Sequence, residues 1–439
     1  MIGGNRFPLL FLFVITAAVF AASCGGDDST SPTPSGPTYN FGLSSQVVAG
    51  NGDADNVSAI DFAPDGRMFY AEQFKTTDSG DQGVIRVVLP DGSLQQQPFA
   101  SIPVANYLGL DWGLTGLALD PDFATNHYVY AFYTAVAGDQ IGKPTLVRFT
   151  DSNGTGTDQT TISDDFPQTF ANHQGYNANG DIHFGPDGFL YVSVGDYDQG
   201  TADPAQGGHP ELVSDLSSPI GKILRISKED GSAAPDNPFV SQQGADPRIF
   251  AYGFREPFPF TFDSTGNLYG TDNTPDTCEE INLIKAGGNY GWATGWAFPF
   301  SDCTVGQGTQ PIYNFARAGQ KPGDFLSFVE SQGMSFLTSS TYSQLKDSLL
   351  VCESQKSGVQ QPGQSQVTIS PGSLVSMVLS APDKIDSSAE VVNDCKGEVA
   401  THAGIVYYAN KTEIRKLVQG SAGGGATTAS NQLPPSLGS

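Results

Sequence analysis

Two histidines lie in residues 172–188, which read NHQGYNANGDIHFGPDG. Imidazole titrates near neutral pH, so a well-placed histidine can act as a general base. His183 stands beside Phe184 in a strand pattern, which indicates a packed or half-exposed structural residue. His173 stands in the preceding loop, and loops on a rigid scaffold carry many catalytic groups. His173 is therefore the better candidate base, although its position alone does not distinguish it from an ordinary surface histidine.

A repeated pattern predicts the scaffold that would hold such a loop. An apolar residue, a turn rich in Pro, Asp and Gly, and a short run of β-branched and aromatic residues recur along the chain, whereas helical periodicity is scarce. The six copies cover residues 61–73, 118–134, 183–196, 261–272, 340–353 and 399–410. This repetition predicts an all-β fold, a six-bladed β-propeller of four-stranded antiparallel blades, with an array of β-sandwiches as the structural alternative.

Within each copy, most residues have a structural role. We expect Gly66 and Gly188 to adopt positive φ in their turns. Phe62, Leu119 and Phe184 should help to fill the spaces between blades. The globular domain should cover residues 41–418, because 419–439 has the composition of a disordered tail.

The N-terminal segment has the pattern of a secretory signal, predicted to span residues 1–23. Small residues directly before Cys24 resemble a bacterial lipobox, in which the cysteine receives a lipid that tethers the mature chain to a membrane. Ala21 stands where a larger aliphatic residue is usual, so plain secretion stays open. Residues 24–40 are rich in Gly, Ser and Pro, which suits a flexible linker. We expect an exported protein, either a cell-envelope lipoprotein or a secreted one.

The formal net charge of −25 argues against nucleic acid as a partner. Apart from Cys24 the chain has four cysteines, an even number that favours disulfides in an exported protein. Nearest neighbours in sequence would pair Cys278 with Cys303 and Cys352 with Cys395, out of three connectivities.

Several motifs occur together and in order between residues 45 and 417. They are DWGLTGLALDPDFATNHYVYAFYT, GDIHFGPDGFLYVSVGD, SSPIGKILRI, IFAYGFREPFPFTFD and CEEINLIKAGGNYGW. In this combination the chain resembles the soluble quinoprotein glucose and sorbosone dehydrogenase family. The resemblance implies a six-bladed β-propeller that binds pyrroloquinoline quinone (PQQ) and calcium and oxidises sugars or related alcohols and aldehydes.

The resemblance also implies a general base. The family's histidine matches His173, followed by Gln174, if residues 176–179 are an insertion; without that gap, Asn177 falls at the position of the base. An asparagine cannot accept the proton at neutral pH, so the alignment decides whether the site can work. The aspartate that orients the family's histidine matches Asp196.

Further residues carry over to the cofactor. Arg255 matches an arginine beside the quinone's reactive carbonyls, with Glu256 where the family usually has asparagine. Lys356 matches a lysine that binds a cofactor carboxylate, and Asn273 is assigned to the cofactor as well. The calcium ligands would be the backbone carbonyls of Thr274 and Pro275. Carboxylates at Asp272 and Asp276 would favour that cation.

The chain also departs from the family. Where the family's last blade presents arginines to the cofactor carboxylates, this sequence offers only Lys396. Each lost charge-assisted bond is worth roughly 1.5–3 kcal/mol, so PQQ affinity could be much lower. Asp111 replaces a glutamine of the glucose-oxidising members and would place a negative charge near the substrate.

Three functions fit these observations. We favour the quinoprotein oxidoreductase, acting on a small sugar-like substrate. The first alternative is a propeller without cofactor that serves as a surface binding module, and the second is a metal-dependent lactonase. The sequence has no dinucleotide-binding, phosphate-loop or HExxH motif. Trp292 and Trp296 are expected in the core or in a channel wall.

Overall fold

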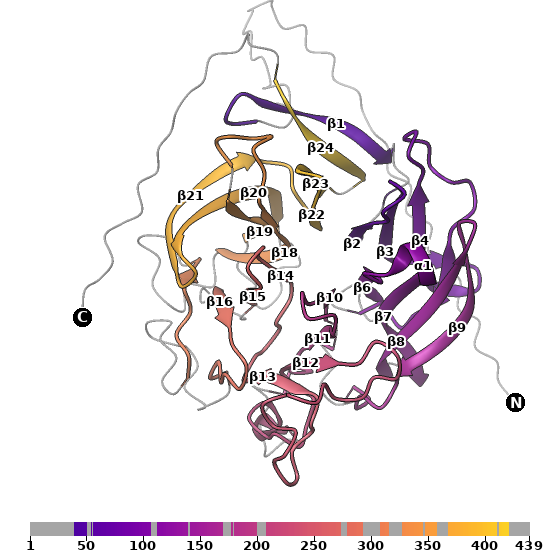
Figure 1. Ribbon diagram of the computed structural model, residues 1–439, viewed down its shortest axis with the longest axis vertical. Coiled ribbons are helices and arrows are strands. Elements are labelled where there is room, and N and C mark those ends of the chain that lie inside the picture. Colours follow the sequence, from indigo (N-terminus) through magenta and orange to yellow (C-terminus); the bar gives the residue numbers. More distant parts are fainter. Residues whose placement is uncertain are drawn as a thin grey trace, which may run out of the picture. The chain divides into compact units, whose positions relative to one another are not determined.

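In a computed structural model of the protein, six four-stranded antiparallel sheets stand around a central axis (Figure 1). The sheets belong to one compact unit that spans residues 37–439. The residues that the structure describes are 39–50, 54, 56–106, 112–138, 141–169, 177–178, 180–199, 208–273, 279–292, 308–315, 327–345, 347–357, 368–410 and 412–420. The predicted six-bladed β-propeller is confirmed.

Each of the first three blades is built from four consecutive strands. Blade 1 contains β2 (Val57–Phe62), β3 (Met68–Thr77), β4 (Gly80–Val88) and β5 (Ala100–Pro103). Blade 2 contains β6 (Leu114–Leu119), β7 (Tyr128–Gly138), β8 (Ile141–Ser152) and β9 (Thr155–Ser163), with a short helix α1 (Phe123–Asn126) between its first two strands. Blade 3 contains β10 (Ile182–Phe184), β11 (Leu190–Val194), β12 (Lys222–Ile226) and β13 (Ile249–Tyr252); a 3₁₀ turn, η3 (Pro210–Val213), precedes β12.

Blades 4 and 5 repeat this order, and blade 6 closes the ring. Blade 4 contains β14 (Phe260–Phe262), β15 (Leu268–Asp272), β16 (Glu280–Ile284) and β17 (Tyr313–Asn314). Blade 5 contains β18 (Ser327–Leu337), β19 (Ser348–Ser357), β20 (Thr368–Ala381) and β21 (Lys384–Val392). Blade 6 contains β22 (Val399–His402), β23 (Ile405–Ala409), β24 (Glu413–Gln419) and the N-terminal strand β1 (Leu43–Gly50).

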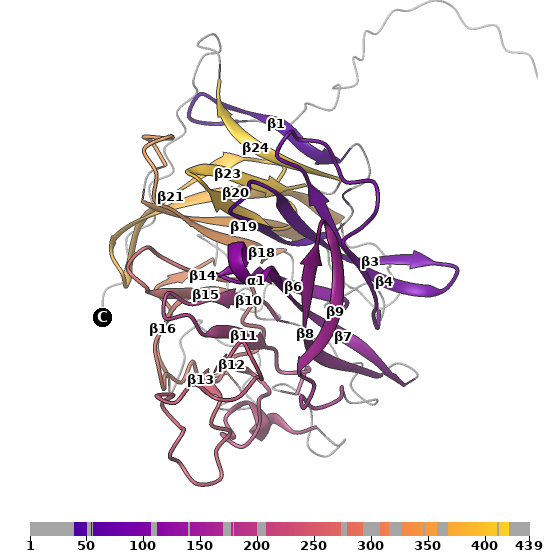
Figure 2. The ribbon, with the colours of Figure 1, turned by 45° about the vertical axis from the view of Figure 1, so that its right-hand side comes forward.

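The repeated sequence pattern corresponds to the hairpin between the first two strands of each blade. Gly66 and Gly188 have φ of 89° and 82° in these turns, as predicted. The pairing of β1 with β24 was not predicted, because the pattern of β1 has no turn or partner strand beside it in the sequence. This antiparallel pair joins the two ends of the domain (Figure 2).

The first strands of the blades lie innermost and bond to one another. Ser58 Oγ donates to Leu114 O at 2.7 Å, and Thr115 Oγ1 donates to Gly180 O at 2.8 Å, which joins blades 1, 2 and 3. Because the strands are antiparallel, each second strand ends beside the start of its first strand. We call this side of the propeller, where β3, β7, β11, β15, β19 and β23 end, the site edge.

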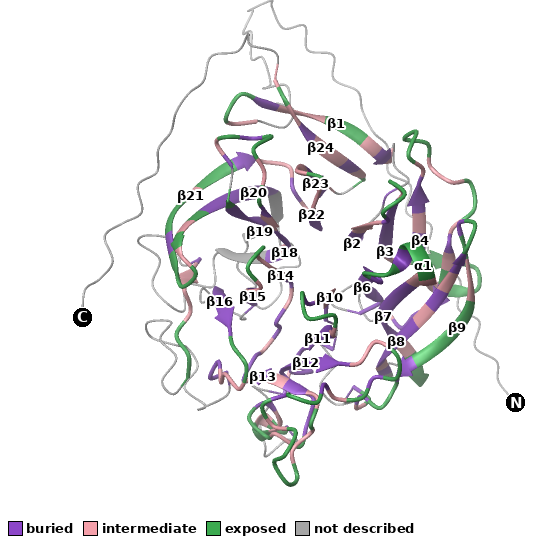
Figure 3. Cartoon of the chain, viewed as in Figure 1, coloured by how far each residue is buried: buried purple, intermediate pink, exposed green. Residues whose placement is uncertain are grey.

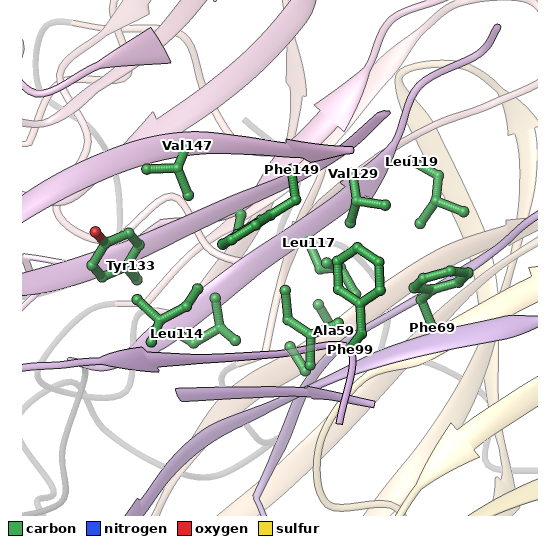
Figure 4. Packing of buried hydrophobic residues seen from close by; sticks show 14 of the residues in the cluster. Ala59, Phe69, Phe99, Leu114, Leu117, Leu119, Val129, Tyr133, Val147 and Phe149 are labelled. Atoms are coloured by element: carbon green, nitrogen blue, oxygen red, sulfur yellow. The ribbon is translucent and has the colours of Figure 1, made fainter. Parts of the chain in front are cut away.

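Apolar side chains fill the spaces between blades. Figure 3 shows the buried residues concentrated on the strands, with exposed residues in the turns and on outer strands such as β9. Between blades 1 and 2, Figure 4 shows Phe69 next to Phe99, and their rings meet edge to face at 5.3 Å. Leu119 belongs to this cluster, whereas Phe184 is partly buried between blades 2 and 3. These interfaces fix the angle between blades and hence the relative positions of loops from different blades.

The predicted disulfide between Cys352 and Cys395 is present, and it joins β19 to the segment before β22. Cys278 and Cys303 lie outside the described residues. Within the described part of the chain, no helix has both the length and the apolar character needed to span a membrane.

Candidate functional site

Asp196 lies directly beyond the end of β11, at the site edge, and is fully buried. Its Oδ1 accepts hydrogen bonds from Asn177 Nδ2 at 3.0 Å and from the Asp198 backbone N–H at 2.7 Å. Its Oδ2 accepts from Trp292 Nε1 at 2.8 Å. A buried carboxylate is tolerated where N–H groups replace water, and these donors come from three separate segments. Asp196 therefore ties together the loop before β10, its own turn and the segment after β16.

The backbone beneath Asp196 is packed too closely for side chains. A Cβ at Gly195 would lie 2.0 Å from the carbonyl oxygen of Asn177. Gly221 has φ of 67°, and a Cβ there would lie 2.6 Å from the carbonyl oxygen of Phe254. Only glycine permits these approaches. They let the Asp196 N–H reach the carbonyl oxygen of Arg255 at 2.6 Å, so the two predicted catalytic residues are directly connected.

Arg255 is held by the carboxylate of Asp272, the last residue of β15. The Arg255 N–H lies 3.0 and 3.1 Å from the two carboxylate oxygens, and the Glu256 N–H lies 2.7 Å from Oδ1. The Arg255 side chain donates from Nη1 to the carbonyl oxygen of Asn273 at 2.5 Å. Glu256 Oε2 lies 3.6 Å from the same Nη1, so its charge offsets part of the guanidinium charge.

Asn273 takes part in the site through its backbone. Its side-chain amide donates to Phe258 O at 2.8 Å, and its Oδ1 accepts from the Ser331 N–H at 3.3 Å. The side chain thus joins blade 4 to the first strand of blade 5. The Asn273 carbonyl fixes the Arg255 guanidinium, as described above.

Buried acids surround this corner of blade 4. Burial raises the pKa of Asp272 to about 7, and the nearby negative charge of Asp196 adds to the rise. Burial and the charge of Asp272 raise the pKa of Glu280 to about 8, against a stabilising bond from Asn282 Nδ2 to Glu280 Oε1. Glu279 is buried too. Burial therefore disfavours the charged forms of Asp272 and Glu280, and a cation bound beside them would favour those forms.

The structure describes only part of the predicted site. Asp196, Arg255 and Asn273 come together, and the backbones of Lys356 in β19 and of Lys396 before β22 reach the same site edge. His183 lies on the inner strand β10 with Nε2 3.0 Å from Asp181 Oδ2, in the predicted half-exposed structural position. The predicted residues outside the described part are His173, Gln174, Thr274, Pro275, Asp276, Asp111 and Trp296.

Three residues have roles in the site that were not predicted. Asn177 is buried with φ of 55° and donates to Asp196, which is the contact that the alignment without the gap gives to the residue at the position of the base. Trp292 was expected in the core or a channel wall, and it is buried, but its indole N–H also serves Asp196. Asp272 positions the Arg255 backbone. Sequence offers one signal for the tryptophan, since a buried indole N–H needs an acceptor.

Comparison with known proteins agrees with this geometry. The profile of the Glucose / Sorbosone dehydrogenase family matches residues 54–363. The chain belongs to this family. It is 29% identical over 250 residues to quinoprotein glucose dehydrogenase B of Acinetobacter calcoaceticus, covering 53% of this chain and 49% of that enzyme. It is 29% identical over 215 residues to the aldose sugar dehydrogenase of Escherichia coli, covering 46% of this chain and 54% of that enzyme. The matched regions span about half of each enzyme.

Solved structures show the same fold. An oxidoreductase of the glucose dehydrogenase type from Thermus thermophilus superposes with a TM-score of 0.62 at 26% identity, covering 86% of this chain and 100% of the other. The PQQ-bound aldose sugar dehydrogenase of Streptomyces coelicolor superposes with a TM-score of 0.60 at 21% identity, covering 85% of this chain and 98% of the other. The second likeness concerns the fold alone.

Replacing Trp292 by Phe should destabilise the protein more than replacing Tyr197 by Phe. The first change removes an N–H bond to a buried carboxylate, worth about 1.5–3 kcal/mol, and the second removes a neutral bond to Pro167 O, worth about 0.5–1.5 kcal/mol. The free energy of unfolding in urea measures both. In an Asp196→Asn background the Trp292→Phe change should cost less; an equal cost in both backgrounds would mean that the bond contributes nothing.

Replacing Glu280 by Gln should make the protein relatively more stable as pH rises. The folded-state pKa of Glu280 is raised from 4.5 to about 8, so its ionisation disfavours the folded state. The free energy of unfolding of the unchanged protein should fall relative to the variant by about 1.4 kcal/mol per pH unit between those two values. Urea unfolding at pH 5 and pH 8 without calcium tests this, with the exposed Glu211→Gln as control; parallel pH profiles for Glu280→Gln and the unchanged protein would contradict it.

Proposed function

We propose that this protein is an exported quinoprotein oxidoreductase that oxidises a sugar or a related alcohol or aldehyde with PQQ and calcium. The observation that carries the proposal is the direct backbone bond of 2.6 Å between Asp196 and Arg255, which come from the ends of neighbouring segments in blade 3 and before blade 4. Membership of the glucose/sorbosone dehydrogenase family supports the same reaction class.

The described residues fit an anionic cofactor. PQQ carries three carboxylates, and Arg255, Lys356 and Lys396 are cationic residues whose backbones lie at the site edge. Arg255 is fixed by Asp272 and Asn273 before any ligand arrives, which lowers the cost of ordering it on binding. When bound, PQQ would accept a hydride from the substrate.

The acidic corner of blade 4 fits a calcium ion nearby. The backbone carbonyls of Thr274 and Pro275 would hold the ion, since calcium prefers oxygen ligands. These residues directly follow Asp272 and Asn273. Burial raises the pKa values of Asp272 and Glu280, and a divalent cation bound nearby would lower them by favouring the carboxylate forms.

In this proposal His173 removes the proton from the substrate hydroxyl while Asp196 orients the imidazole. The three N–H donors hold the Asp196 carboxylate in one orientation and stabilise its negative charge. A carboxylate so held stabilises the imidazolium that forms on His173. Arg255 supplies a fixed positive charge where negative charge develops, and Glu256 weakens that field.

A second candidate is a surface binding module without a cofactor. The ion pair of 3.6 Å between Arg255 and Glu256 favours it, because it reduces the cationic character that PQQ would need. The chain is also 27% identical over 195 residues to the mouse Hedgehog-interacting protein, covering 40% of this chain and 26% of that protein. That relative is named for binding a protein rather than for a reaction.

Export is part of the proposal. Residues 1–23 would be removed as a signal and Cys24 would carry lipid, with residues 24–40 as the linker to the propeller. The buried Cys352–Cys395 disulfide supports an oxidising compartment.

Titration of the protein, without its signal, with PQQ and calcium tests the proposed function. We expect saturable binding in the quinone absorbance and sugar-dependent reduction of an electron-accepting dye. His173→Ala should abolish dye reduction, whereas His183→Gln, which keeps a donor for Asp181, should retain it. Failure of the folded protein to bind micromolar PQQ would favour the binding module. Calcium-dependent lactone hydrolysis without PQQ would point to the lactonase instead.

A further inference from the structure

The Cys352–Cys395 disulfide connects two parts of the site edge that are distant in sequence. Cys352 is in β19, the second strand of blade 5, and both half-cystines are fully buried. Cys395 is in residues 393–398, which join β21 to β22 and are called the strap here. Since the strap leads from the last strand of blade 5 to the first strand of blade 6, the disulfide fastens the connection between these blades to the second strand of blade 5.

The strap is packed directly on the backbone of blade 5. A Cβ at Gly372 would lie 2.0 Å from the carbonyl oxygen of Cys395 and 2.4 Å from that of Glu353. A Cβ at Gly333 would lie 2.6 Å from the Cα of Glu398. Both glycines therefore leave room for the strap, and the disulfide fastens it in that room.

The other side of the strap bonds to blades 6 and 1. The Lys396 N–H donates to the carbonyl oxygen of Ala409, the last residue of β23, at 2.8 Å. The Glu398 N–H donates to the carbonyl oxygen of Val57, the first residue of β2, at 3.4 Å. Since second strands end and first strands begin at the site edge, these bonds place Lys396 on the same edge as Asp196 and Arg255.

Each half of the disulfide is close in sequence to a lysine. Lys396 directly follows Cys395, and Lys356 comes four residues after Cys352 in the same strand. The disulfide thus joins the two segments that carry these lysines. The strap is held at the site edge by backbone bonds and by the disulfide, which alone is covalent and broken by reduction.

We propose that Cys352 and Cys395 are positioning residues for an anionic cofactor, because their disulfide sets the spacing of the segments that carry Lys356 and Lys396. The inference rests on the proposed function and deepens it. Two flexible lysines recognise carboxylates well only when their backbones are fixed in advance, since ordering them on binding costs affinity. The protein without the disulfide should therefore bind PQQ roughly tenfold more weakly.

The test compares the unchanged protein with a Cys352→Ala/Cys395→Ala variant. PQQ binding is titrated with calcium at low and at high salt. We expect the variant to lose affinity chiefly at low salt, because the lost contribution is electrostatic. Val147→Ala, a buried change between blades 1 and 2, is the control for general loss of stability and should leave PQQ affinity unchanged. If the alanine variant does not fold, a Cys352→Val/Cys395→Ala variant, which refills part of the buried apolar volume, is titrated instead.

A double-mutant cycle separates positioning from mere stabilisation. Lys396→Gln should weaken PQQ binding strongly when the disulfide is present and little when it is absent, whereas Lys396→Arg should bind as tightly as the unchanged protein. Equal affinity with and without the disulfide, or additive effects of the two changes, would overturn the inference and leave the proposed function standing. No PQQ binding by the unchanged protein would overturn both.

Discussion

A buried carboxylate must be surrounded by donors, and Asp196 meets this requirement with N–H groups from three chain segments. Asp198 belongs to the same turn, but Asn177 and Trp292 lie 19 and 96 residues from Asp196 in the sequence, so the site forms only when the segments before β10 and after β16 have come together. The same turn donates its N–H to the Arg255 carbonyl. The position of the Arg255 backbone therefore depends on this turn as well as on Asp272, while the Asn273 carbonyl holds the guanidinium.

A propeller brings segments that are distant in sequence together at one edge. Every second strand ends at one edge, so residues directly beyond β11, β15 and β23 approach the axis from different blades without long connections. The apolar clusters between blades hold these ends in register (Figure 3). Titratable side chains gather at this edge, among them the buried acids Asp272 and Glu280, whose pKa values burial raises. An anionic cofactor would bind near the cationic residues of the site edge, and a divalent cation would bind near the acids of blade 4.

The sequence predicted the blade number because each hairpin repeats its own turn chemistry, as at Gly66 and Gly188. It also predicted the Cys352–Cys395 pair. It could not show that Asn177 and Trp292 serve the same carboxylate, because such contacts depend on how separate blades are packed. The closure of blade 6 by β1 was missed for the same reason, since its partner β24 lies at the other end of the domain.

Hydrogen–deuterium exchange with and without PQQ and calcium would test most directly whether the site edge is where the cofactor binds. The account predicts slower exchange in peptides that contain residues 194–199 and 253–258, which carry Asp196 and Arg255. The turns at the opposite edge, such as residues 63–67 of blade 1, should exchange at an unchanged rate. Protection confined to those turns, or binding without protection around Asp196, would contradict the account.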